Sequence, residues 1–336
     1  MAKVYYEDDG DMSTLNDRTI AVIGFGNQGR VQAENLRDSG LKVIVGNRGD
    51  DVKEAAAKAG FQVFNIAEAV KKADVVMMLI PDEVMPEVFA EDVAPNLKQG
   101  AAVDFASGYT VGFGLIGPPS GIDVIMIAPR MIGPGVRDAY LKGTGFPSFV
   151  AVHQDATGSG EAVMLALAKG LGTLKAGAME LTMRMEAELD LFNEQCFGPA
   201  FGRVLLSAIE LAIESGYPVE AVMLEILMSG EFAYTINKMV EVGIVEQMNF
   251  HSQTSQYGSM TRGARYMGLP VKDLMKEVFE EIRSGTFVKE WQEEKESGME
   301  KFNNLVKLRK MIPVNDWERK TREAFKNLGG NESDES

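Results

Sequence analysis

Hydrophobic positions follow two different periods along the chain, and the change from one to the other divides it. In the first half, short β-branched runs end at Gly, Asp or Pro, and amphipathic stretches of about 12 residues follow them, which is typical of parallel βαβ units. Six such runs with helices between them predict a doubly wound parallel sheet. The strand-like runs are Thr19–Ile23, Lys42–Val45, Asp74–Ile80, Ala102–Phe105, Asp123–Ile127 and Ser148–Val152.

After Thr182 the pattern changes to long helical stretches rich in Met, Leu, Glu and Ala. The expected helices are Met183–Ser215, Pro218–Ser229, Phe232–Val242, Val271–Ser284, Thr286–Ser297 and Met299–Leu308. We therefore predict an α/β domain over residues 1–182 and an all-α domain over residues 183–328. Residues 329–336 carry no apolar side chain and are predicted to form a disordered acidic tail.

A glycine-rich string, Gly24-Phe25-Gly26-Asn27-Gln28-Gly29, lies between the first strand and a helix that runs to about Ser39. The first glycine permits a tight turn, the second lets backbone N–H groups approach a pyrophosphate, and the third lets helix and strand pack closely. Such strings also occur in purely structural turns. Its place at the head of a βαβ unit favours a dinucleotide site of the Rossmann type, with all six residues of the string in it.

The cofactor's adenosine ribose is expected near the end of the second strand, where Arg48, Asp50 and Asp51 lie. Arg48 could stack on adenine or hold a 2′-phosphate, which would suit NADPH. Asp50 and Asp51 would repel that phosphate and could accept from a free 2′-hydroxyl, which favours NADH. A third interpretation is that both aspartates only cap the next helix.

Composition excludes several classes of protein. The chain has 336 residues and a formal charge of −15, from 49 acidic and 34 basic residues, so partners such as nucleic acid or anionic membrane are not expected. The single cysteine, Cys196, cannot form an intrachain disulfide, and the N-terminus lacks the apolar region of a signal peptide. No apolar run approaches the about 20 residues that span a bilayer, so a cytoplasmic protein is expected.

Three acidic residues, Glu186, Asp190 and Glu194, recur every four positions and lie along one helix face. Their mutual repulsion would be relieved by a bound cation. A solvated acidic face is the alternative, but the neighbouring side chains are apolar: Leu189, Leu191, Phe192 and Phe197. Glu225 on the next helix could complete the set. Because the chain has only two histidines, a hard-metal site must use carboxylates, which suits Mg²⁺.

Longer strings resemble the ketol-acid (acetohydroxy-acid) reductoisomerases in their short bacterial and archaeal form. The resemblance covers nearly the whole chain, and such strings are more specific than the glycine motif. The strings that carry it are Gly24–Gly29, Asn35–Gly40, Leu79–Val84, Val150–Ala156, Asp190–Gln195 and Gly285–Trp291.

The resemblance implies a Rossmann domain followed by a knotted helical domain, in a homodimer or higher homo-oligomer with shared active sites. It implies a reaction in which two Mg²⁺ ions drive an alkyl migration in a 2-hydroxy-2-methyl-3-keto acid. NADPH, or less often NADH, then reduces the rearranged ketone, in valine, leucine and isoleucine synthesis. Within the Leu79–Val84 string, it places Pro81 and Asp82 at the cofactor.

The same resemblance implies roles for particular residues. By position, Asp190 and Glu194 match the principal metal ligands, and Glu225 matches a third carboxylate of the metal site, which also makes it a candidate catalytic residue. Ser252 looks like the serine that contacts the substrate carboxylate.

Three positions of the expected active site depart from the family pattern. Ser107 stands where the family has histidine, Arg130 where it has lysine, and Ser229 where it has a substrate-contacting glutamate. Alkyl migration needs a base for the hydroxyl proton, but serine is a poor acid and base near neutral pH and arginine stays protonated. Arg130 also offers a planar fork for a carboxylate or phosphate, and Ser229 leaves the pocket less negative by one charge, so these two exchanges together suggest a more anionic substrate.

The leading hypothesis is therefore an oxidoreductase that reduces a small 2-keto or 3-hydroxy-2-keto acid with NAD(P)H, while Mg²⁺ polarises the ketone. One alternative is the full reductoisomerase reaction on 2-acetolactate, with the metal site supplying the base. Another is a non-catalytic sensor that binds dinucleotide and signals through its oligomer. A dehydrogenase that oxidises a 2-hydroxy acid would use the same site.

Overall fold

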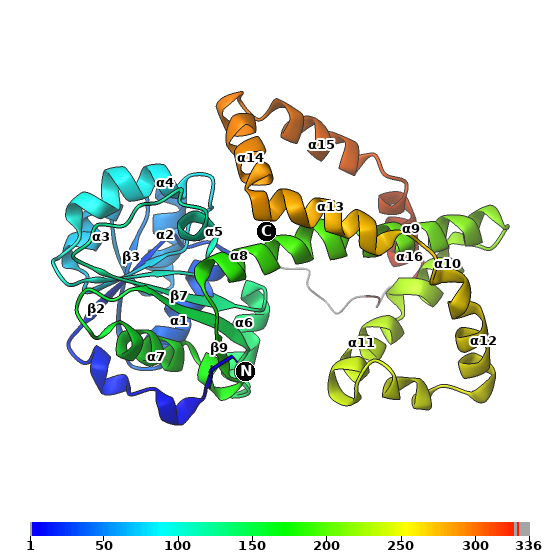
Figure 1. Ribbon diagram of the computed structural model, residues 1–336, viewed down its shortest axis with the longest axis horizontal. Coiled ribbons are helices and arrows are strands. Elements are labelled where there is room, and N and C mark those ends of the chain that lie inside the picture. Colours follow the sequence, from blue (N-terminus) through cyan, green and yellow to red (C-terminus); the bar gives the residue numbers. More distant parts are fainter. Residues whose placement is uncertain (1, 326–327, 329–336) are drawn as a thin grey trace. The chain divides into compact units, whose positions relative to one another are not determined.

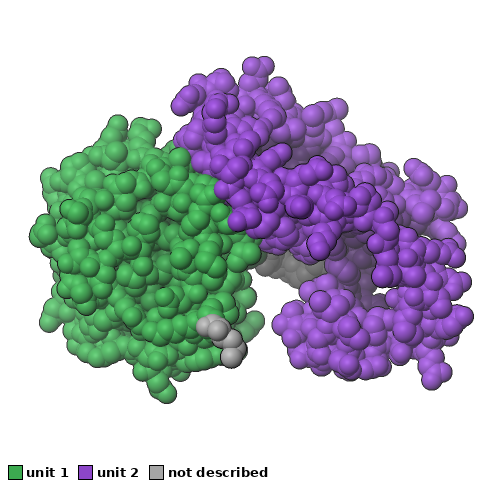
Figure 2. Space-filling model, viewed as in Figure 1, with its two compact units in different colours: residues 1–190 green, residues 191–336 purple. Residues whose placement is uncertain are grey.

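The computed structural model describes residues 2–325 and 328, so the predicted acidic tail lies outside the described residues. Its contacts separate two compact units, Met1–Asp190 and Leu191–Ser336, coloured green and purple in Figure 2. The boundary predicted at residue 182 falls just before helix α8 (Met183–Phe192), most of which belongs to the first unit. The division into domains at that residue stays a prediction.

The first unit is built on a nine-stranded sheet in the order β1-β9-β8-β7-β6-β5-β2-β3-β4. Six of these strands, β4-β3-β2-β5-β6-β7, are all parallel and reproduce the doubly wound order, whose switch point lies between β2 and β5. The strands are β1 Val4–Tyr5, β2 Thr19–Ile23, β3 Lys42–Gly46, β4 Gln62–Phe64, β5 Val75–Met78, β6 Ala102–Phe105, β7 Asp123–Pro129, β8 Ser148–Gln154 and β9 Ala178–Glu180.

The structure corrects the strand prediction in two ways. Strand β8 pairs antiparallel with β7, with Ser148 opposite Pro129, although the pattern favoured an all-parallel sheet. Antiparallel strands beside a parallel core are common, and hydrophobicity alone does not encode strand direction. Strands β1, β4 and β9 were not predicted, because each is too short to show a hydrophobic period.

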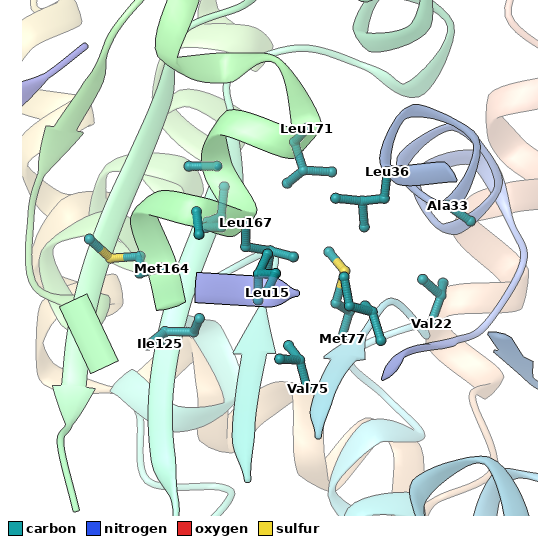
Figure 3. Close-up of a cluster of buried hydrophobic side chains, with 14 of the residues drawn as sticks. Leu15, Val22, Ala33, Leu36, Val75, Met77, Ile125, Met164, Leu167 and Leu171 are labelled. Atoms are coloured by element: carbon teal, nitrogen blue, oxygen red, sulfur yellow. The ribbon is translucent and has the colours of Figure 1, made fainter. Parts of the chain in front are cut away.

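Helices cover both faces of this sheet (Figure 1). On one face, α1 and α7 enclose a cluster of fully buried side chains (Figure 3), which includes Leu36, Leu171, Met77 and Ile125. The opposite face buries a second cluster, which contains Ile66 and Val70 of α3. The helices are α1 Asn27–Asp38, α2 Asp50–Lys58, α3 Ile66–Lys72, α4 Met85–Val88, α5 Tyr109–Gly112, α6 Gly133–Leu141 and α7 Gly160–Leu171.

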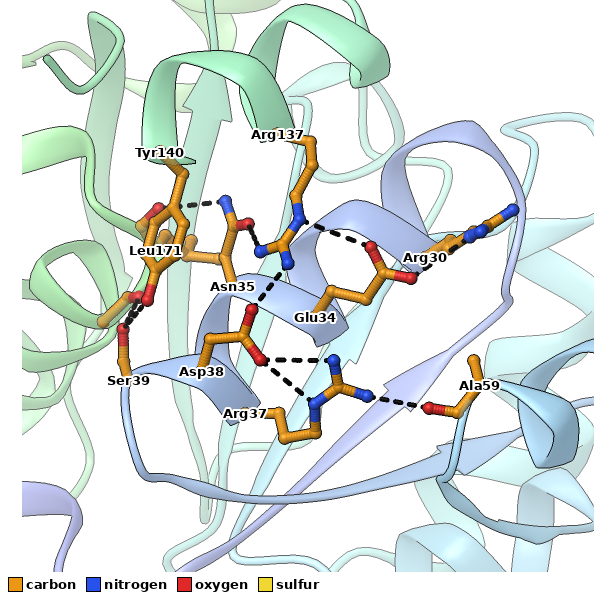
Figure 4. A network of polar contacts seen from close by, with 11 residues as sticks. Arg30, Glu34, Asn35, Arg37, Asp38, Ser39, Ala59, Arg137, Tyr140 and Leu171 are labelled. Carbon is orange, nitrogen blue, oxygen red and sulfur yellow. Dashed lines mark hydrogen bonds and ion pairs between the residues drawn. The ribbon is translucent and has the colours of Figure 1, made fainter. Parts of the chain in front are cut away.

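A polar network fixes helix α1, whose N-terminus carries the glycine-rich string (Figure 4). Arg137 of α6 donates to Asp38 at 2.6 Å and to the fully buried Asn35 at 2.8 Å. The amide of Asn35 in turn donates to the Leu171 carbonyl at 3.3 Å. Buried polar groups with satisfied partners specify one packing arrangement, so this network fixes the C-terminal half of α1 against α6 and α7.

The second unit is helical throughout its described residues. Two of its helices, α12 and α16, were not predicted. Helix α12 has only two large apolar side chains, Tyr257 and Met260, and α16 has few apolar side chains, among them Trp317, which packs against the cluster that contains Ile209 and Met223. The helices after α8 are α9 Gly198–Glu214, α10 Val219–Met223, α11 Glu231–Val242, α12 Gln253–Gly263, α13 Val271–Ser284, α14 Thr286–Glu296, α15 Glu300–Lys310 and α16 Val314–Ala324.

Helix α8, a π-helical turn and α9 form one continuous helix, Met183–Glu214. By length and composition it could cross a membrane, with a mean hydropathy of 1.5 over an 18-residue window of which 11% is buried. Arg203 and Glu210 interrupt the apolar stretch of this helix and pair with each other at 3.0 Å. One such helix is weak support for a membrane, because helices of soluble proteins meet the same criteria.

One buried carboxyl group in the sheet makes stability depend on pH. Asp104 of β6 is fully buried, and neither of its oxygens has a hydrogen-bond partner of normal geometry among the described residues. Burial raises the pKa of Asp104 well above its ordinary value, and the nearby Ile127 amide only partly offsets this. The folded state therefore favours the protonated acid, and its contribution to stability is lost as pH rises through the raised pKa.

We expect Asp104→Asn to remove this dependence, because the amide is neutral at every pH. From about pH 5 upward, the free energy of unfolding of the wild type should fall relative to that of the variant. Urea denaturation of both proteins at a series of pH values measures the difference. Parallel pH profiles would contradict the assignment to Asp104.

Candidate active site

The candidate site begins with four loops that follow neighbouring strands of the first unit. These loops come after β2, β5, β6 and β7 and contain Gly24, Leu79, Ser107 and Arg130. The carboxyl ends of parallel strands meet at one edge of a sheet, so the loops gather beside the switch point. Backbone hydrogen bonds join two of them, since the amide of Leu79 donates to the carbonyl of Ile23 at 2.8 Å.

The glycine-rich string has the geometry of a phosphate-binding loop. Gly24 has a φ of +97°, and a Cβ there would lie 2.4 Å from the Leu79 carbonyl oxygen. A Cβ on Gly29 would lie 2.3 Å from the Gly24 oxygen, whereas one on Gly26 would meet nothing within 4 Å. Gly26 therefore faces open space at the N-terminus of α1, where a pyrophosphate can accept from backbone N–H groups. These residues fit a dinucleotide.

The other members of the string hold the loop in place. Phe25 is buried and packs edge-to-face on Phe61, with ring centroids 5.6 Å apart. Gln28 donates from Nε2 to the Met131 carbonyl oxygen at 3.0 Å, which links α1 to the loop after β7. A Cβ on Gly133 would lie 2.2 Å from the Asn27 oxygen, so Gly133 is a positioning residue that the sequence analysis missed. The signal for it in the sequence was a glycine three residues after Arg130.

The expected ribose region contains an ion pair that was not predicted. Arg48 donates from Nη2 and Nε to Asp92 Oδ2, at 2.7 and 3.0 Å, and its Nη2 lies 3.5 Å from Glu91. Both acids belong to a π-helical turn, Phe89–Val93. The other two ribose candidates, Asp50 and Asp51, open helix α2, and the side chain of Asp51 is exposed.

The strongest polar cluster joins the loops after β6 and β7 to helix α8. Arg130 donates from Nη1 to Glu186 Oε1 at 3.0 Å and from Nη2 to Asp190 Oδ1 at 2.5 Å. The Gly108 amide donates to Glu186 Oε2 at 2.7 Å, and the Glu186 side chain is 1% exposed. The predicted spacing on one helix face is thus correct for Glu186 and Asp190, which are not part of a solvated face. No separate role was predicted for Glu186.

The surroundings of Glu186 shift the pKa of its carboxyl group. Burial raises the pKa of Glu186 to about 7, with the charges of Asp190 and Asp82 adding to the shift and Gly108 and Arg130 opposing it. Burial also raises the pKa of Tyr109 to about 12, with a further contribution from Asp82. A carboxyl group with a pKa near 7 can exchange a proton at neutral pH, which suits general acid–base chemistry.

The loop after β6 is held tightly against the first turn of α8. Ser107 Oγ accepts from the Tyr109 amide at 3.2 Å, so this hydroxyl shapes the turn. A Cβ on Gly108 would lie 2.0 Å from the Met183 carbonyl oxygen. Gly108 is therefore a second glycine that positions the site and that sequence reasoning did not single out.

The remaining candidates lie on the second unit. Glu194 and Glu225 both have exposed side chains and lie in π-helical turns, Asn193–Phe197 and Leu224–Met228. π-Turns in helices are frequent at functional sites, which supports a role for both. Ser229 Oγ accepts from the Glu231 amide at 3.3 Å, and Ser252 caps helix α12 by accepting from Ser255 at 3.2 Å. That these residues share a site with Arg130 stays a prediction.

The residues fit a divalent cation only in part. Carboxylate oxygens are the donors that Mg²⁺ prefers, and Asp190 and Glu194 lie about one turn apart on a single helix. However, the described residues contain no group of three His, Cys, Asp or Glu side chains arranged to hold a metal. The oxygen Asp190 Oδ1 is already bound to Arg130.

A doubly wound sheet with a glycine loop at its switch point, followed by a helical domain, defines an NAD(P)-dependent oxidoreductase of the two-domain class. Residues 14–177 match the family model "Acetohydroxy acid isomeroreductase, NADPH-binding domain", and residues 183–327 match "Ketol-acid reductoisomerase, C-terminal domain". The chain belongs to the ketol-acid reductoisomerase family. The predicted family, fold class and enzyme class are thereby confirmed, and the enzyme is favoured over the non-catalytic sensor.

Relatives are similar over almost their whole length. The chain is 44% identical over 316 residues to the ketol-acid reductoisomerase (NADP(+)) of Pyrobaculum aerophilum, covering 94% of this chain and 96% of the relative. It is 45% identical to the Methanopyrus kandleri enzyme of the same name, covering 89% and 90%. A solved NADH-preferring ketol-acid reductoisomerase from an uncultured archean superposes with a TM-score of 0.90 at 34% identity, covering 96% and 99%. The predicted knot in the helical domain stays a prediction.

Proposed function

We propose that this chain reduces a small 3-hydroxy-2-keto acid of the branched-chain amino acid type with NADH, and that it performs alkyl migration poorly or not at all. The observation that supports the proposal is the pair of ionic hydrogen bonds that the Arg130 guanidinium donates to Glu186 and Asp190. Arginine remains charged at physiological pH, so this position cannot take up a proton.

The glycine loop and α1 would bind the dinucleotide, which supplies the hydride for the 2-keto carbon. Asp190, Glu194 and Glu225 would hold Mg²⁺, which supplies Lewis-acid polarisation of the ketone. The hydroxyl of Ser252 keeps its proton free to donate to the substrate carboxylate, because Oγ is the acceptor in its helix cap. Glu186 would hold the guanidinium of Arg130 in place, because its two oxygens accept from Arg130 and from the Gly108 amide.

Alkyl migration also requires a base, and the residues at the site supply one poorly. The hydroxyl next to the migrating carbon must lose its proton as the new bond forms. At the three positions that depart from the family pattern, Ser107 shapes its own turn, Ser229 accepts from Glu231, and Arg130 is a fixed cation. None of the three can serve as that base.

The full reductoisomerase reaction is the second candidate. Identity of 44% to a relative named ketol-acid reductoisomerase (NADP(+)), over 94% of this chain, favours it. Glu186 favours it too, because a carboxylate with a pKa of about 7 could act as the base if it reached the substrate hydroxyl.

Steady-state oxidation of NADH separates the two candidates. The purified protein is assayed anaerobically with Mg²⁺ and either 3-hydroxy-3-methyl-2-ketobutyrate or 2-acetolactate. We expect turnover of the first compound and at least about 100-fold lower kcat/KM with the second, a difference of about 2.7 kcal/mol. Equal turnover of both would support the full reaction, and turnover of neither would remove both proposals.

We also propose that NADH is preferred over NADPH. Asp92 and Glu91 neutralise the guanidinium of Arg48 and add two carboxylates near the expected ribose. A 2′-phosphate would have to compete with Asp92 for Arg48 and would face the charge of Glu91. A free 2′-hydroxyl carries no charge, so it does not compete with Asp92 for Arg48 and is not repelled by Glu91.

Replacing Asp92 with asparagine should shift this preference. The variant frees Arg48 to bind a 2′-phosphate, so we expect the KM for NADPH to fall by about tenfold, or about 1.4 kcal/mol, while the KM for NADH changes little. Glu188→Gln, which removes an acid paired with Arg184 on α8, is the matched control and should change neither constant. An unchanged KM ratio in Asp92→Asn would show that Arg48 does not face the ribose.

The long helix Met183–Glu214 is the proposed basis of a homodimer or higher homo-oligomer. Several large apolar side chains on it are exposed in the single chain, among them Phe197, Val204 and Leu211. Apolar patches of this kind mark association surfaces, and another copy of the chain would cover them in a cytoplasmic protein with no membrane or nucleic-acid partner.

We expect Val204→Glu to dissociate that assembly, because a buried unpaired carboxylate is strongly unfavourable. Light scattering should show a drop in molar mass for this variant. Leu141→Glu, on α6 of the first unit and similarly exposed, should leave the molar mass unchanged. If Val204→Glu keeps the wild-type mass, this helix is not the interface.

A further inference from the structure

A cleft of about 520 Å³ lies near one edge of the sheet in the first unit, where the N-terminus runs beside β9 (Figure 1). It forms because β8 and β9 separate. Their register pairs end at Val150 and Glu180, after which β8 continues to Gln154 while the chain leaves β9 and enters α8. None of the residues that line it belongs to the four loops of the candidate active site. A cleft of this size can hold a small molecule.

Two opposite charges border this cleft side by side, since the Glu180 amide donates to the Lys3 carbonyl at 2.9 Å. Lys3 Nζ donates to Glu161 at 2.9 Å, which leaves two of its three N–H groups for a ligand. The single hydroxyl hydrogen of Tyr5 is shared between Glu161 at 3.0 Å and Glu180 at 3.2 Å, so the Glu180 carboxylate retains most of its capacity to accept. The pair is suited to a ligand that carries both an ammonium group and a carboxylate. The exposed imidazole of His153 offers a further hydrogen-bonding group.

Other parts of the cleft lining are apolar. Ala151 and Met183 are buried members of the core cluster on the α3 face of the sheet. Val152 and Met185 also line the cleft, and their side chains are exposed. An aliphatic group placed here would remove apolar surface from water, and the flexible thioether chains can adapt to its shape. A small molecule with both charges and an aliphatic group is an α-amino acid with an apolar side chain.

The first turn of α8 joins the cleft to the cluster around Arg130. Met183 opens this helix, and its carbonyl oxygen lies 2.0 Å from where a Cβ on Gly108 would be. The Gly108 amide donates to Glu186, which also accepts from Arg130. Because close packing leaves no free space at this contact, a ligand that moves Met183 also disturbs the Gly108–Glu186 hydrogen bond.

We infer that this cleft is an inhibitory effector site for an aliphatic α-amino acid, with the ammonium group on Glu180, the carboxylate on Lys3 and the side chain against the methionines of α8. Binding at the site depends only on the geometry of the first unit, whereas the effect on turnover rests on the proposed function. The aliphatic group of such a ligand is of the same kind as that of the proposed keto acid substrate. The site would therefore link reduction to the level of a related amino acid.

Calorimetry tests the binding without any turnover. The full-length protein, with no keto acid present, is titrated with L-leucine, and one molecule should bind per chain. Glycine has both charges but no aliphatic group, and 4-methylpentanoate lacks the ammonium group, so each should bind at least about tenfold more weakly. Absence of L-leucine binding, or equal binding of the three compounds, would overturn the inference.

Variants of the lining residues locate the bound amino acid. Glu180→Gln removes the charge that faces the ammonium group and should weaken L-leucine binding by at least about tenfold. Met185→Glu places a charge on the apolar lining at an exposed position, and should have the same effect if the glutamine variant does not fold. The matched control, Glu188→Gln, changes an acid of α8 outside the cleft and should bind as the wild type does. Wild-type affinity in both cleft variants would mean that L-leucine binds elsewhere, and the inference would be wrong.

Steady-state kinetics test the effect on turnover. Saturating L-leucine should lower kcat for NADH-dependent reduction of 3-hydroxy-3-methyl-2-ketobutyrate by at least about threefold in the wild type and leave it unchanged in Glu180→Gln. A rise in KM alone would indicate competition at the active site and would overturn the effector role. If the keto acid is not reduced at all, the proposed function fails, and calorimetry of the variants still decides whether the cleft binds the amino acid.

Discussion

Replacing Asp190 with asparagine is expected to lower kcat/KM for NADH-dependent reduction of 3-hydroxy-3-methyl-2-ketobutyrate by about 10²- to 10³-fold. The amide keeps the size of the side chain but removes its negative charge. Arg130 then loses its shorter ion pair, and the proposed cation loses a ligand. Steady-state kinetics at saturating Mg²⁺ measure the loss, and thermal unfolding checks that the fold is retained.

Glu188→Gln is the control for this variant as well. Glu188 lies on the same helix and pairs with Arg184 at 2.7 Å, away from Arg130, so its replacement should change kcat/KM by less than about twofold. If Asp190→Asn and Glu188→Gln behave alike, the cluster around Arg130 is structural and the active site lies elsewhere.

The second large effect is expected from the glycine loop, where two substitutions should behave differently. Gly26→Ala places a methyl group in open space, so the melting temperature should stay within about 2 °C of the wild type. Affinity for NADH should nevertheless fall by about 10²-fold, because the methyl group occupies the path of the pyrophosphate. Fluorescence titration of bound NADH and thermal unfolding measure the two quantities.

Gly29→Ala should damage the fold and the cofactor site together. Its Cβ would lie 2.3 Å from the Gly24 carbonyl oxygen, which forces α1 away from β2. Overpacking of this kind costs about 1–3 kcal/mol, so both the melting temperature and the affinity for NADH should fall. If Gly26→Ala leaves NADH affinity unchanged, the pyrophosphate does not pass this loop.

Much of the fold could be predicted because its signals are local. The β-branched runs at Thr19–Ile23 and Ala102–Phe105 became strands with the predicted bounds, and Val271–Ser284 became helix α13. The direction of β8 could not be predicted, because it depends on pairing with β7 across the sheet. The helix α12 was missed for a related reason, since no apolar stripe marks it.

Individual residues of the candidate site could be predicted from the sequence, but the contacts between them could not. Spacing of four placed Glu186 and Asp190 on one face, yet nothing in the sequence showed that Arg130 lies between them. The Arg48–Asp92 pair joins residues from different loops and was equally invisible. Side chains brought together by the order of strands leave no local pattern, so such contacts appear only once the sheet is assembled.

We propose that this enzyme reduces a keto acid without moving an alkyl group, and nuclear magnetic resonance of labelled substrate tests this proposal most directly. The wild type is incubated with Mg²⁺, NADH and 2-acetolactate carrying ¹³C in the methyl group on C2. We predict that the label stays on C2 throughout a period in which 3-hydroxy-3-methyl-2-ketobutyrate is fully reduced in a parallel sample. If the labelled methyl group appears on C3 of 2,3-dihydroxy-3-methylbutyrate at a comparable rate, the enzyme performs alkyl migration and the proposal is wrong.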